Sequence, residues 1–200
     1  GPVIEAGIPY VTVSEDGVYT EKFSLPHGFS DAVDEAVLFC KKNNLSRIRH
    51  FTVQDGDHIA HNIYNFVYDS IKRLYPKSDF QRVIFKTQTG APEEIQYCFH
   101  EYLKTHEFDM AFTPNRKIGV IFNHQYTMKH GYDFPLKIKH ICFVDAPIFE
   151  WTYPTISSVN IPLRSIGKFS AQLMQSIIEN RTYSQQTFSS SIIHRDSTLL

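Results

Sequence analysis

Four short segments of this 200-residue sequence carry the side chains best suited to binding a small polar molecule. They cover residues 54–58, 87–91, 114–116 and 145–151. Their polar and aromatic members include Asp55, Asp57, His58, Asn115, Arg116, Asp145, Phe149 and Trp151. Carboxylate and amide oxygens accept hydrogen bonds from hydroxyl groups, and aromatic rings cover the apolar face of a sugar. The same Asp and Asn side chains could instead only cap the helices that follow them.

The sequence shows no motif for catalysis. It contains no nucleophile elbow and no glycine-rich phosphate loop, because Gly56 and Gly90 stand alone. His58 and His61 are spaced to share a helical face, but such a pair without further ligands is a weak metal signal. We therefore expect a protein that is not an enzyme and that holds neither a metal ion nor a cofactor.

The composition is that of a globular protein. Hydrophobic residues make up 42% of the chain, which is enough for a core. The net charge of −1 argues against a protein that binds nucleic acid through a large overall positive charge. The longest apolar runs are far shorter than the roughly 20 residues of a membrane span. Cys40, Cys98 and Cys142 are widely spaced among apolar neighbours, as expected for buried free thiols in a reducing cytoplasm. The chain begins with Gly1-Pro2 and shows no secretory signal, so we expect a cytoplasmic protein whose natural start lies upstream.

Hydrophobic spacing predicts a regular alternation of helices and strands. Helices are expected at residues 31–42, 59–74, 92–103, 114–130 and 163–180. Strands are expected at residues 8–14, 47–53, 80–86, 109–113, 139–144 and 190–194, and residues 150–162 are expected to be irregular. This alternation implies an α/β fold with a Rossmann-like parallel sheet. Because ligands bind at the carboxyl ends of the strands in such a sheet, the four polar segments should meet at one edge.

A series of short motifs runs through the chain in a fixed order. They are Gly7-Ile-Pro-Tyr-Val11, Ala111-Phe-Thr-Pro-Asn115, Asp133-Phe-Pro135, Ile141-Cys-Phe-Val-Asp145, Pro154-Thr-Ile-Ser-Ser-Val159, Pro162-Leu-Arg-Ser-Ile-Gly167 and Ile193-His-Arg-Asp-Ser-Thr198. Together they resemble the effector-binding domain of the lactose-repressor (LacI/GalR) family of bacterial transcription regulators, over nearly the whole chain. The closing Arg-Asp-Ser-Thr favours these regulators over periplasmic binding proteins of the same fold.

The resemblance implies a small-molecule effector, expected to be a sugar. Asp145 matches the family's effector-contacting aspartate, and Phe112 and Asn115 match positions that line the pocket. Two departures indicate an unusual effector or a remodelled pocket. Arg116 stands where the family has an acid, and the family's effector-touching arginine falls near Asn62, where this chain has none. The predicted effector-binding residues are Asp145, Asn115, Phe112, Asp57, His58, Asn62 and Trp151.

The family's sensor has the type I periplasmic binding protein architecture, with two Rossmann-like lobes. On that scheme residues 1–29 are a remnant of the N-terminal lobe and residues 30–149 are the C-terminal lobe. Residues 150–162 cross between the lobes, residues 163–180 form a helix returning to the N-terminal lobe, and residues 181–200 hold the last strand. The DNA-binding head and the first half of the N-terminal lobe have no counterpart here. The resemblance implies a homodimer that meets DNA only through a domain absent from this chain.

Two other functions stay open at this point. A solute-binding protein of a sugar transport system would have the same fold, and the terminal Arg195-Asp-Ser-Thr198 counts against it. An enzyme on the same α/β scaffold is disfavoured for want of a catalytic constellation. The leading hypothesis is the ligand-sensing domain of a bacterial transcription regulator.

Overall fold

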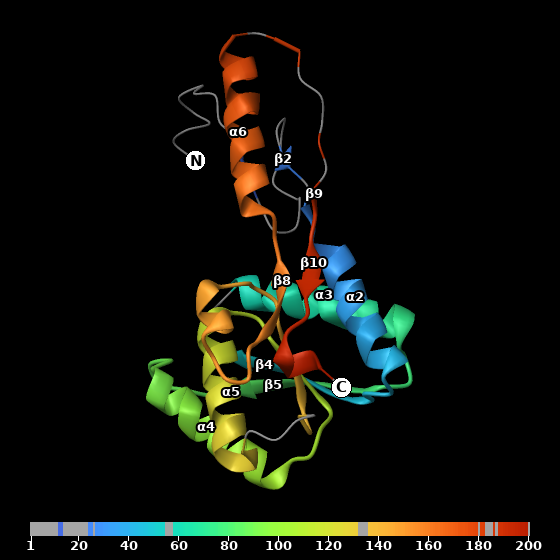
Figure 1. Ribbon diagram of the computed structural model, residues 1–200, viewed down its shortest axis with the longest axis vertical. Coiled ribbons are helices and arrows are strands. Elements are labelled where there is room, and N and C mark those ends of the chain that lie inside the picture. Colours follow the sequence, from blue (N-terminus) through green and yellow to red (C-terminus); the bar gives the residue numbers. More distant parts are fainter. Residues whose placement is uncertain are drawn as a thin grey trace. The chain divides into compact units, whose positions relative to one another are not determined.

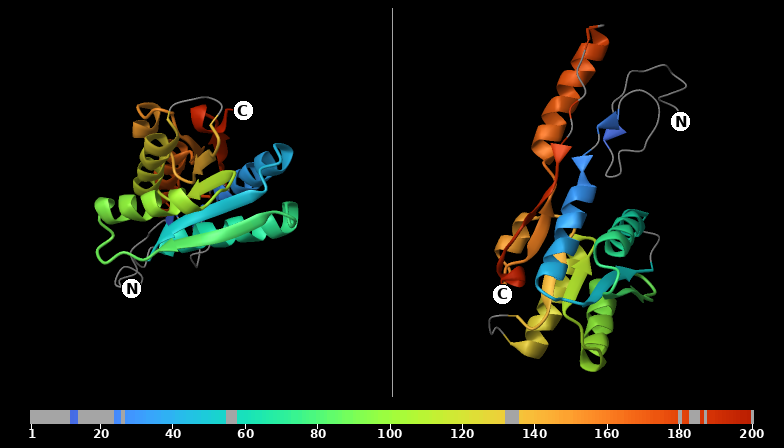
Figure 2. Two further views of the ribbon diagram at one scale, coloured as in Figure 1. Left: turned by 90° about the horizontal axis from the view of Figure 1, so that it is seen from below. Right: turned by 90° about the vertical axis from the view of Figure 1, so that its right-hand side faces the viewer.

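The computed structural model describes residues 12–13, 24–25, 27–54, 58–131, 136–179, 181–182, 186 and 188–199. The chain divides into two compact units. Gly1–Asp31 and Ile161–Ser190 belong to unit 1, and Ala32–Asn160 and Ser191–Leu200 belong to unit 2. Figure 1 labels the elements, and Figure 2 gives two further views.

Unit 2 is built on a six-stranded sheet with the strand order β10-β8-β7-β6-β4-β5. The strands are β4 (Arg47–Val53), β5 (Asp79–Phe85), β6 (Met110–Thr113), β7 (Lys139–Cys142), β8 (Ser157–Asn160) and β10 (Ser191–Ile193). All neighbours run parallel except β10 and β8, which are antiparallel. Every residue of β4 after Arg47 is buried, as is typical of a parallel strand covered on both faces.

Helices cover both faces of this sheet. They are α2 (Phe29–Lys42), α3 (His58–Leu74), α4 (Pro92–Thr105) and α5 (Arg116–His130). Phe51 of β4 packs against Phe99 of α4, with ring centroids 5.0 Å apart. The preceding residue, His50, projects from the opposite face and contacts Tyr64 of α3 at 5.6 Å. Figure 1 accordingly shows α2 and α3 on one side of β4 and β5, and α4 and α5 on the other.

Local sequence fixes both ends of α5. The side chain of Asn115 accepts a hydrogen bond from the backbone N–H of Ile118 at 3.1 Å, which caps the first turn. Gly131 ends the helix with φ at +76°, a conformation that side chains with a Cβ rarely adopt. The helix therefore begins directly after β6, at the edge where ligands are expected.

The strands and helices expected between residues 31 and 144 are confirmed, with ends displaced by a residue or two. The prediction that residues 150–162 are irregular is wrong. This stretch contains the end of the short helix η1 (Pro147–Glu150) and the strand β8. Ser157 and Ser158 gave β8 the composition of a loop, but both are fully buried and both hydroxyls are hydrogen-bonded. A polar strand is stable inside a protein when its polar atoms have partners.

The last strand also differs from the expected all-parallel arrangement, because β10 is antiparallel to β8. The chain leaves unit 2 after Asn160, passes through unit 1 and returns at Ser191. No helical crossover within unit 2 links the two strands, so the rule that makes β-α-β strands parallel does not apply to them.

The described residues of unit 1 form two short parallel strand pairs and one long helix. The pairs are β1 (Thr12–Val13) with β2 (Ser24–Leu25), and β3 (His27–Gly28) with β9 (Phe188–Ser189). Of the strand expected at residues 8–14, only residues 12–13 lie among the described residues. The helix α6 (Leu163–Ile178) buries Ile166 and Leu173 in a small core with Phe188. None of the described helices has the length and apolar character needed to cross a membrane.

Two imidazole rings are fully buried in unit 2. Burial lowers the pKa of His140 to about 3, and burial together with the charge of Arg82 lowers the pKa of His50 to about 3. His140 Nε2 lies 2.9 Å from Thr113 Oγ1, while the ring of His50 contacts Tyr64 and Phe143. Both rings are therefore neutral in the folded protein at neutral pH.

Acid should destabilise unit 2 well above the range in which carboxylates titrate. An unfolded histidine takes up a proton near pH 6.5, whereas these two cannot do so until about pH 3. Their contribution to stability is therefore lost as the pH falls below 6.5, by about 2 kcal/mol for each histidine at about pH 5. Urea unfolding at several pH values measures this loss. His50→Leu should remove the share of His50 and leave that of His140. Equal slopes for His50→Leu and the unchanged protein would contradict the assignment.

Candidate functional site

Residues from β6 and β7 meet at the carboxyl edge of the sheet in unit 2. The two strands are neighbours, and their last residues, Thr113 and Cys142, are paired. Asn115 and Asp145 follow these strands within three residues. The structure thus brings two of the predicted effector-binding residues to one edge, as the parallel topology requires.

Phe112 is too deeply buried to line the surface of a pocket. Its side chain is fully buried, and its ring meets that of Phe143 edge to face at 5.2 Å. Asn115 lies at the edge itself, where its side-chain oxygen caps α5. Phe112 therefore forms the floor beneath the edge, while Asn115 lies at its surface.

The residues predicted around the start of α3 are only partly described. Asp57 lies outside the described residues, and of His58 the structure describes only the backbone, which opens α3. Asn62 is half-buried, one turn further along α3. Because β4 lies beside β6 and α3 follows β4, this helix start belongs to the same edge of the sheet.

Asp145 is held in place by two donors from other parts of unit 2. Arg195 Nη1 donates to Asp145 Oδ1 at 3.1 Å, and the hydroxyl of Ser158 donates to the same oxygen. The side chain of Asp145 is 30% exposed. The carboxylate is thus fixed in direction and still reaches solvent, as a ligand-binding acceptor needs.

We call residues Arg195–Thr198 the terminal clamp, because they fasten β7 and β8 together. The hydroxyl of Ser197 donates to the carbonyl of His140 in β7 at 2.7 Å and accepts from the N–H of Ser157 in β8 at 2.8 Å. The hydroxyl of Thr198 lies 2.8 Å from that of Ser157. Three of the clamp's residues form the short helix η2 (Asp196–Thr198). The Arg-Asp-Ser-Thr motif thus has a structural role in this chain.

The clamp also binds the segment that precedes β8. Asp196 Oδ2 accepts from the N–H of Thr155, and the N–H of Asp196 donates to Thr155 Oγ1, both at 3.1 Å. Arg195 Nη1 donates to the carbonyl of Ile156 at 2.8 Å. These bonds satisfy polar groups of a segment that itself lies outside any helix or strand.

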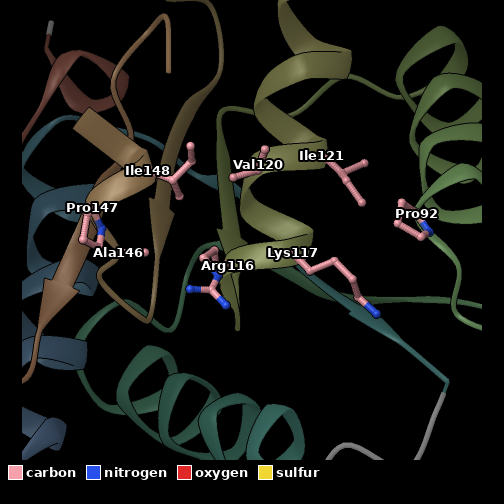
Figure 3. Close-up of a pocket in the computed structure, with 8 residues that line it drawn as sticks. All are labelled: Pro92, Arg116, Lys117, Val120, Ile121, Ala146, Pro147 and Ile148. Atoms are coloured by element: carbon pink, nitrogen blue, oxygen red, sulfur yellow. The ribbon is translucent and has the colours of Figure 1, made fainter. Parts of the chain in front are cut away.

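An apolar groove of about 570 Å³ lies beside this edge, between η1 and α5. It is lined by Pro92, Arg116, Lys117, Val120, Ile121, Ala146, Pro147 and Ile148. Figure 3 shows Ile148 of η1 facing Val120 of α5, with the side chains of Arg116 and Lys117 nearby at the start of α5. Trp151 follows η1 on the segment that leads back to β8, and its side chain is 81% exposed. The structure therefore places Trp151 on the surface, three residues after Ile148, which lines the groove.

Sequence reasoning missed Ser158 and Arg195, which bond to Asp145, and Glu150, which pairs with Arg195. Ser158 and Arg195 were read as parts of family motifs, and Glu150 carried no signal at all. The serines of motif 154–159 and the mostly polar motif 193–198 could have suggested a joint role. Their contact across about forty positions of sequence is visible only in the folded chain.

The other reactive groups of unit 2 are those of a protein interior. Burial raises the pKa of the Cys142 thiol to about 11, and it also raises the pKa of Cys40. Cys98 is only half-buried, unlike the expectation for all three cysteines. Among the described residues, no group of three or more His, Cys, Asp and Glu side chains is arranged to hold a metal ion.

No protein-family model and no curated protein sequence matches the chain. Solved structures do match it. The Escherichia coli transcriptional repressor AscG has a TM-score of 0.78 at 17% identity, with 98% of this chain and 72% of that chain covered. A sugar-binding LacI-family regulator of Escherichia coli, in complex with phosphate, has a TM-score of 0.78 at 18% identity, with 98% and 70% covered. A LacI-family regulator of Enterococcus faecium with bound ribose has a TM-score of 0.75 at 13% identity, with 96% and 71% covered.

These likenesses show the fold. The chain has the architecture of the periplasmic-binding-protein-like domain of LacI-family regulators, as the sequence motifs led us to expect. Which residues of this chain touch an effector stays a prediction, as does the assignment of residues to named lobes.

Removing the Ser197 hydroxyl should destabilise unit 2. Ser197→Ala leaves the buried N–H of Ser157 and the buried carbonyl of His140 without this partner, at a cost of about 1–3 kcal/mol. The measurement is urea unfolding followed by circular dichroism. Ser78→Ala is the matched control, because the carbonyl of Tyr75 keeps its bond from the N–H of Ser78. A loss no larger than that of the control would show that the terminal clamp is not needed for stability.

Proposed function

We propose that this chain, which has the fold of a LacI-family sensor, is the ligand-sensing domain of a bacterial transcription regulator. It binds a sugar and controls DNA binding by a head that is not among these 200 residues. The observation that carries the proposal is the carboxylate of Asp145, held by Arg195 and Ser158 at the carboxyl end of β7. The domain is not an enzyme and acts in the cytoplasm, as fits a regulator.

The chemistry of this edge suits a neutral molecule that is rich in hydroxyl groups. A carboxylate that already receives two donors on one oxygen is fixed in orientation, and its solvent-facing side accepts hydrogen bonds from hydroxyls. Asn115 supplies an amide at the end of the neighbouring strand. Arg116 replaces the acid that the family has here, and it lines the adjacent groove. The set of groups around the sugar thus differs from that of a typical family member.

Asp145→Asn should weaken the binding of a sugar by about ten-fold to a hundred-fold, because a charge-assisted hydrogen bond contributes about 1.5–3 kcal/mol. Isothermal titration calorimetry with a panel that includes D-ribose and lactose identifies a binder, and the variant is then titrated with it. Asp69→Asn, on the exposed face of α3, is the control and should bind normally. Unchanged affinity in Asp145→Asn would place the site elsewhere, and a panel without any binder would contradict the sugar-sensing function.

We also propose that the regulator works as a homodimer through the surface beside the groove. Ile148, Trp151 and Tyr153 are 40%, 81% and 56% exposed and lie within six residues of one another. Large apolar and aromatic side chains gathered on a surface favour association with a partner surface. Arg116 and Lys117 add a charged rim to the same region. We name Ile148, Trp151 and Tyr153 the aromatic face.

A charge placed in the aromatic face should separate the dimer. Ile148→Asp introduces a carboxylate at an exposed position, so the fold should tolerate it while the dimer dissociation constant rises about ten-fold or more. Sedimentation velocity over a range of protein concentrations measures the change. Met128→Asp, at an exposed position near the far end of α5, is the control and should leave association unchanged. An unchanged sedimentation profile for Ile148→Asp would exclude this face as the interface.

A further inference from the structure

One arginine contacts both ends of the segment that carries η1. Arg195 Nη1 lies 3.1 Å from Asp145 Oδ1, and Arg195 Nη2 lies 3.4 Å from Glu150 Oε1. Asp145 and Glu150 are the first and last residues of the segment 145–150. A single planar guanidinium therefore joins the proposed sugar-binding carboxylate to the far end of η1.

The guanidinium is anchored firmly on the side of Asp145 and loosely on the side of Glu150. The side chain of Arg195 is only 10% exposed. Its Nη1 also donates to the carbonyl of Ile156 at 2.8 Å and to the hydroxyl of Ser158 at 2.7 Å. The contact with Glu150 is the longest of the set, and the side chain of Glu150 is 65% exposed. The pair with Glu150 thus has room to tighten or to separate.

The segment between the two carboxylates supports the aromatic face. Phe149 is fully buried against Cys142, Ala146 and Ile156, and it anchors η1 to the unit. Ile148, next to this anchor, is exposed and lines the groove. Trp151 follows directly after Glu150, and its N–H bonds to the carbonyl of Ile148 at 3.1 Å. A small change in the position of Glu150 should therefore also move Ile148 and Trp151.

We infer that the chain of charges Asp145–Arg195–Glu150 transmits the state of the sugar site to the aromatic face. This inference rests on the proposed function for its ligand. A hydroxyl that donates to Asp145 shares the negative charge of this carboxylate and weakens its hold on Arg195. The guanidinium then attracts Glu150 more strongly, and η1 moves with it. By reciprocity, a partner bound at the aromatic face changes the affinity for the sugar by the same factor.

The chain contains one tryptophan, Trp151, which reports on the end of η1 without any label. Asp145→Asn removes the negative charge without a ligand, so it should shift the emission of Trp151 as sugar binding does. The same substitution in a Glu150→Gln background should produce no more than about a third of that shift, because the link to η1 is then broken. An equal shift in both backgrounds would overturn the inference.

The sugar arm of the test uses the binder found in the panel. Calorimetry should show that Glu150→Gln binds this sugar within about two-fold of the unchanged protein, while most of the Trp151 response to the sugar is lost. Binding by calorimetry with a full Trp151 response in Glu150→Gln would overturn the coupling and leave the proposed function standing. A panel without a binder would instead end the proposed function, and the comparison of Asp145→Asn in the two backgrounds would still decide the coupling.

Two further variants serve as a substitute for Asp145→Asn and as a control. Ser158→Ala removes a donor to Asp145 and replaces Asp145→Asn if that variant fails to fold, as judged by circular dichroism. Without this donor Asp145 holds Arg195 more tightly, so the emission of Trp151 should shift in the direction opposite to that caused by Asp145→Asn, and only when Glu150 is present. Glu101→Gln is the matched control, because Glu101 is a partly exposed carboxylate paired with Lys104 elsewhere in unit 2. It should leave both the sugar affinity and the Trp151 response unchanged.

Discussion

The sheet of unit 2 depends on buried hydroxyl groups that find their partners far away in the sequence. Ser157 and Ser158 open β8 and are fully buried, and a buried polar atom without a partner is destabilising. Ser197, Thr198 and Arg195 supply those partners. The hydrogen bonds of the terminal clamp therefore stabilise β8, whereas apolar packing stabilises β4. Because the clamp also reaches β7, two neighbouring strands share one set of polar contacts.

The same contacts decide what the carboxyl edge can do. A carboxylate at the end of β7 would otherwise turn freely in solvent, and it would lose conformational entropy on meeting a ligand. Arg195 and Ser158 fix its direction before any ligand arrives. Structural stability and the proposed ligand recognition thus share one arginine, so the two roles can be separated only by variants that act on Glu150 or Asp145 alone.

The sequence predicted elements well where local pattern decides the structure. β4 carries Ile48, Phe51 and Val53 in a short stretch between two helical patterns, and Asn115 followed by an apolar helical stripe marks the start of α5. It failed for β8, because the serines are compatible with a strand only once the clamp has folded onto them. The predicted parallel topology correctly placed Asp145 at the carboxyl edge of the sheet. It did not predict that Phe112 is fully buried, because this burial depends on Phe143, which follows the adjacent strand. The bond from Arg195 depends on a contact that spans 50 residues, which no local pattern encodes.

The clamp has a consequence for how the chain is made. Ser197 bonds to Ser157 across 40 residues, and the intervening chain runs through unit 1. A ribosome therefore releases almost all of unit 2, and then the returning part of unit 1, before the residues that complete the sheet emerge. Until that moment β8 presents unpaired hydroxyls and an open edge, which is the condition that favours wrong pairing or recognition by chaperones. The order of synthesis thus makes the completion of the carboxyl edge of the sheet the last event in the folding of unit 2.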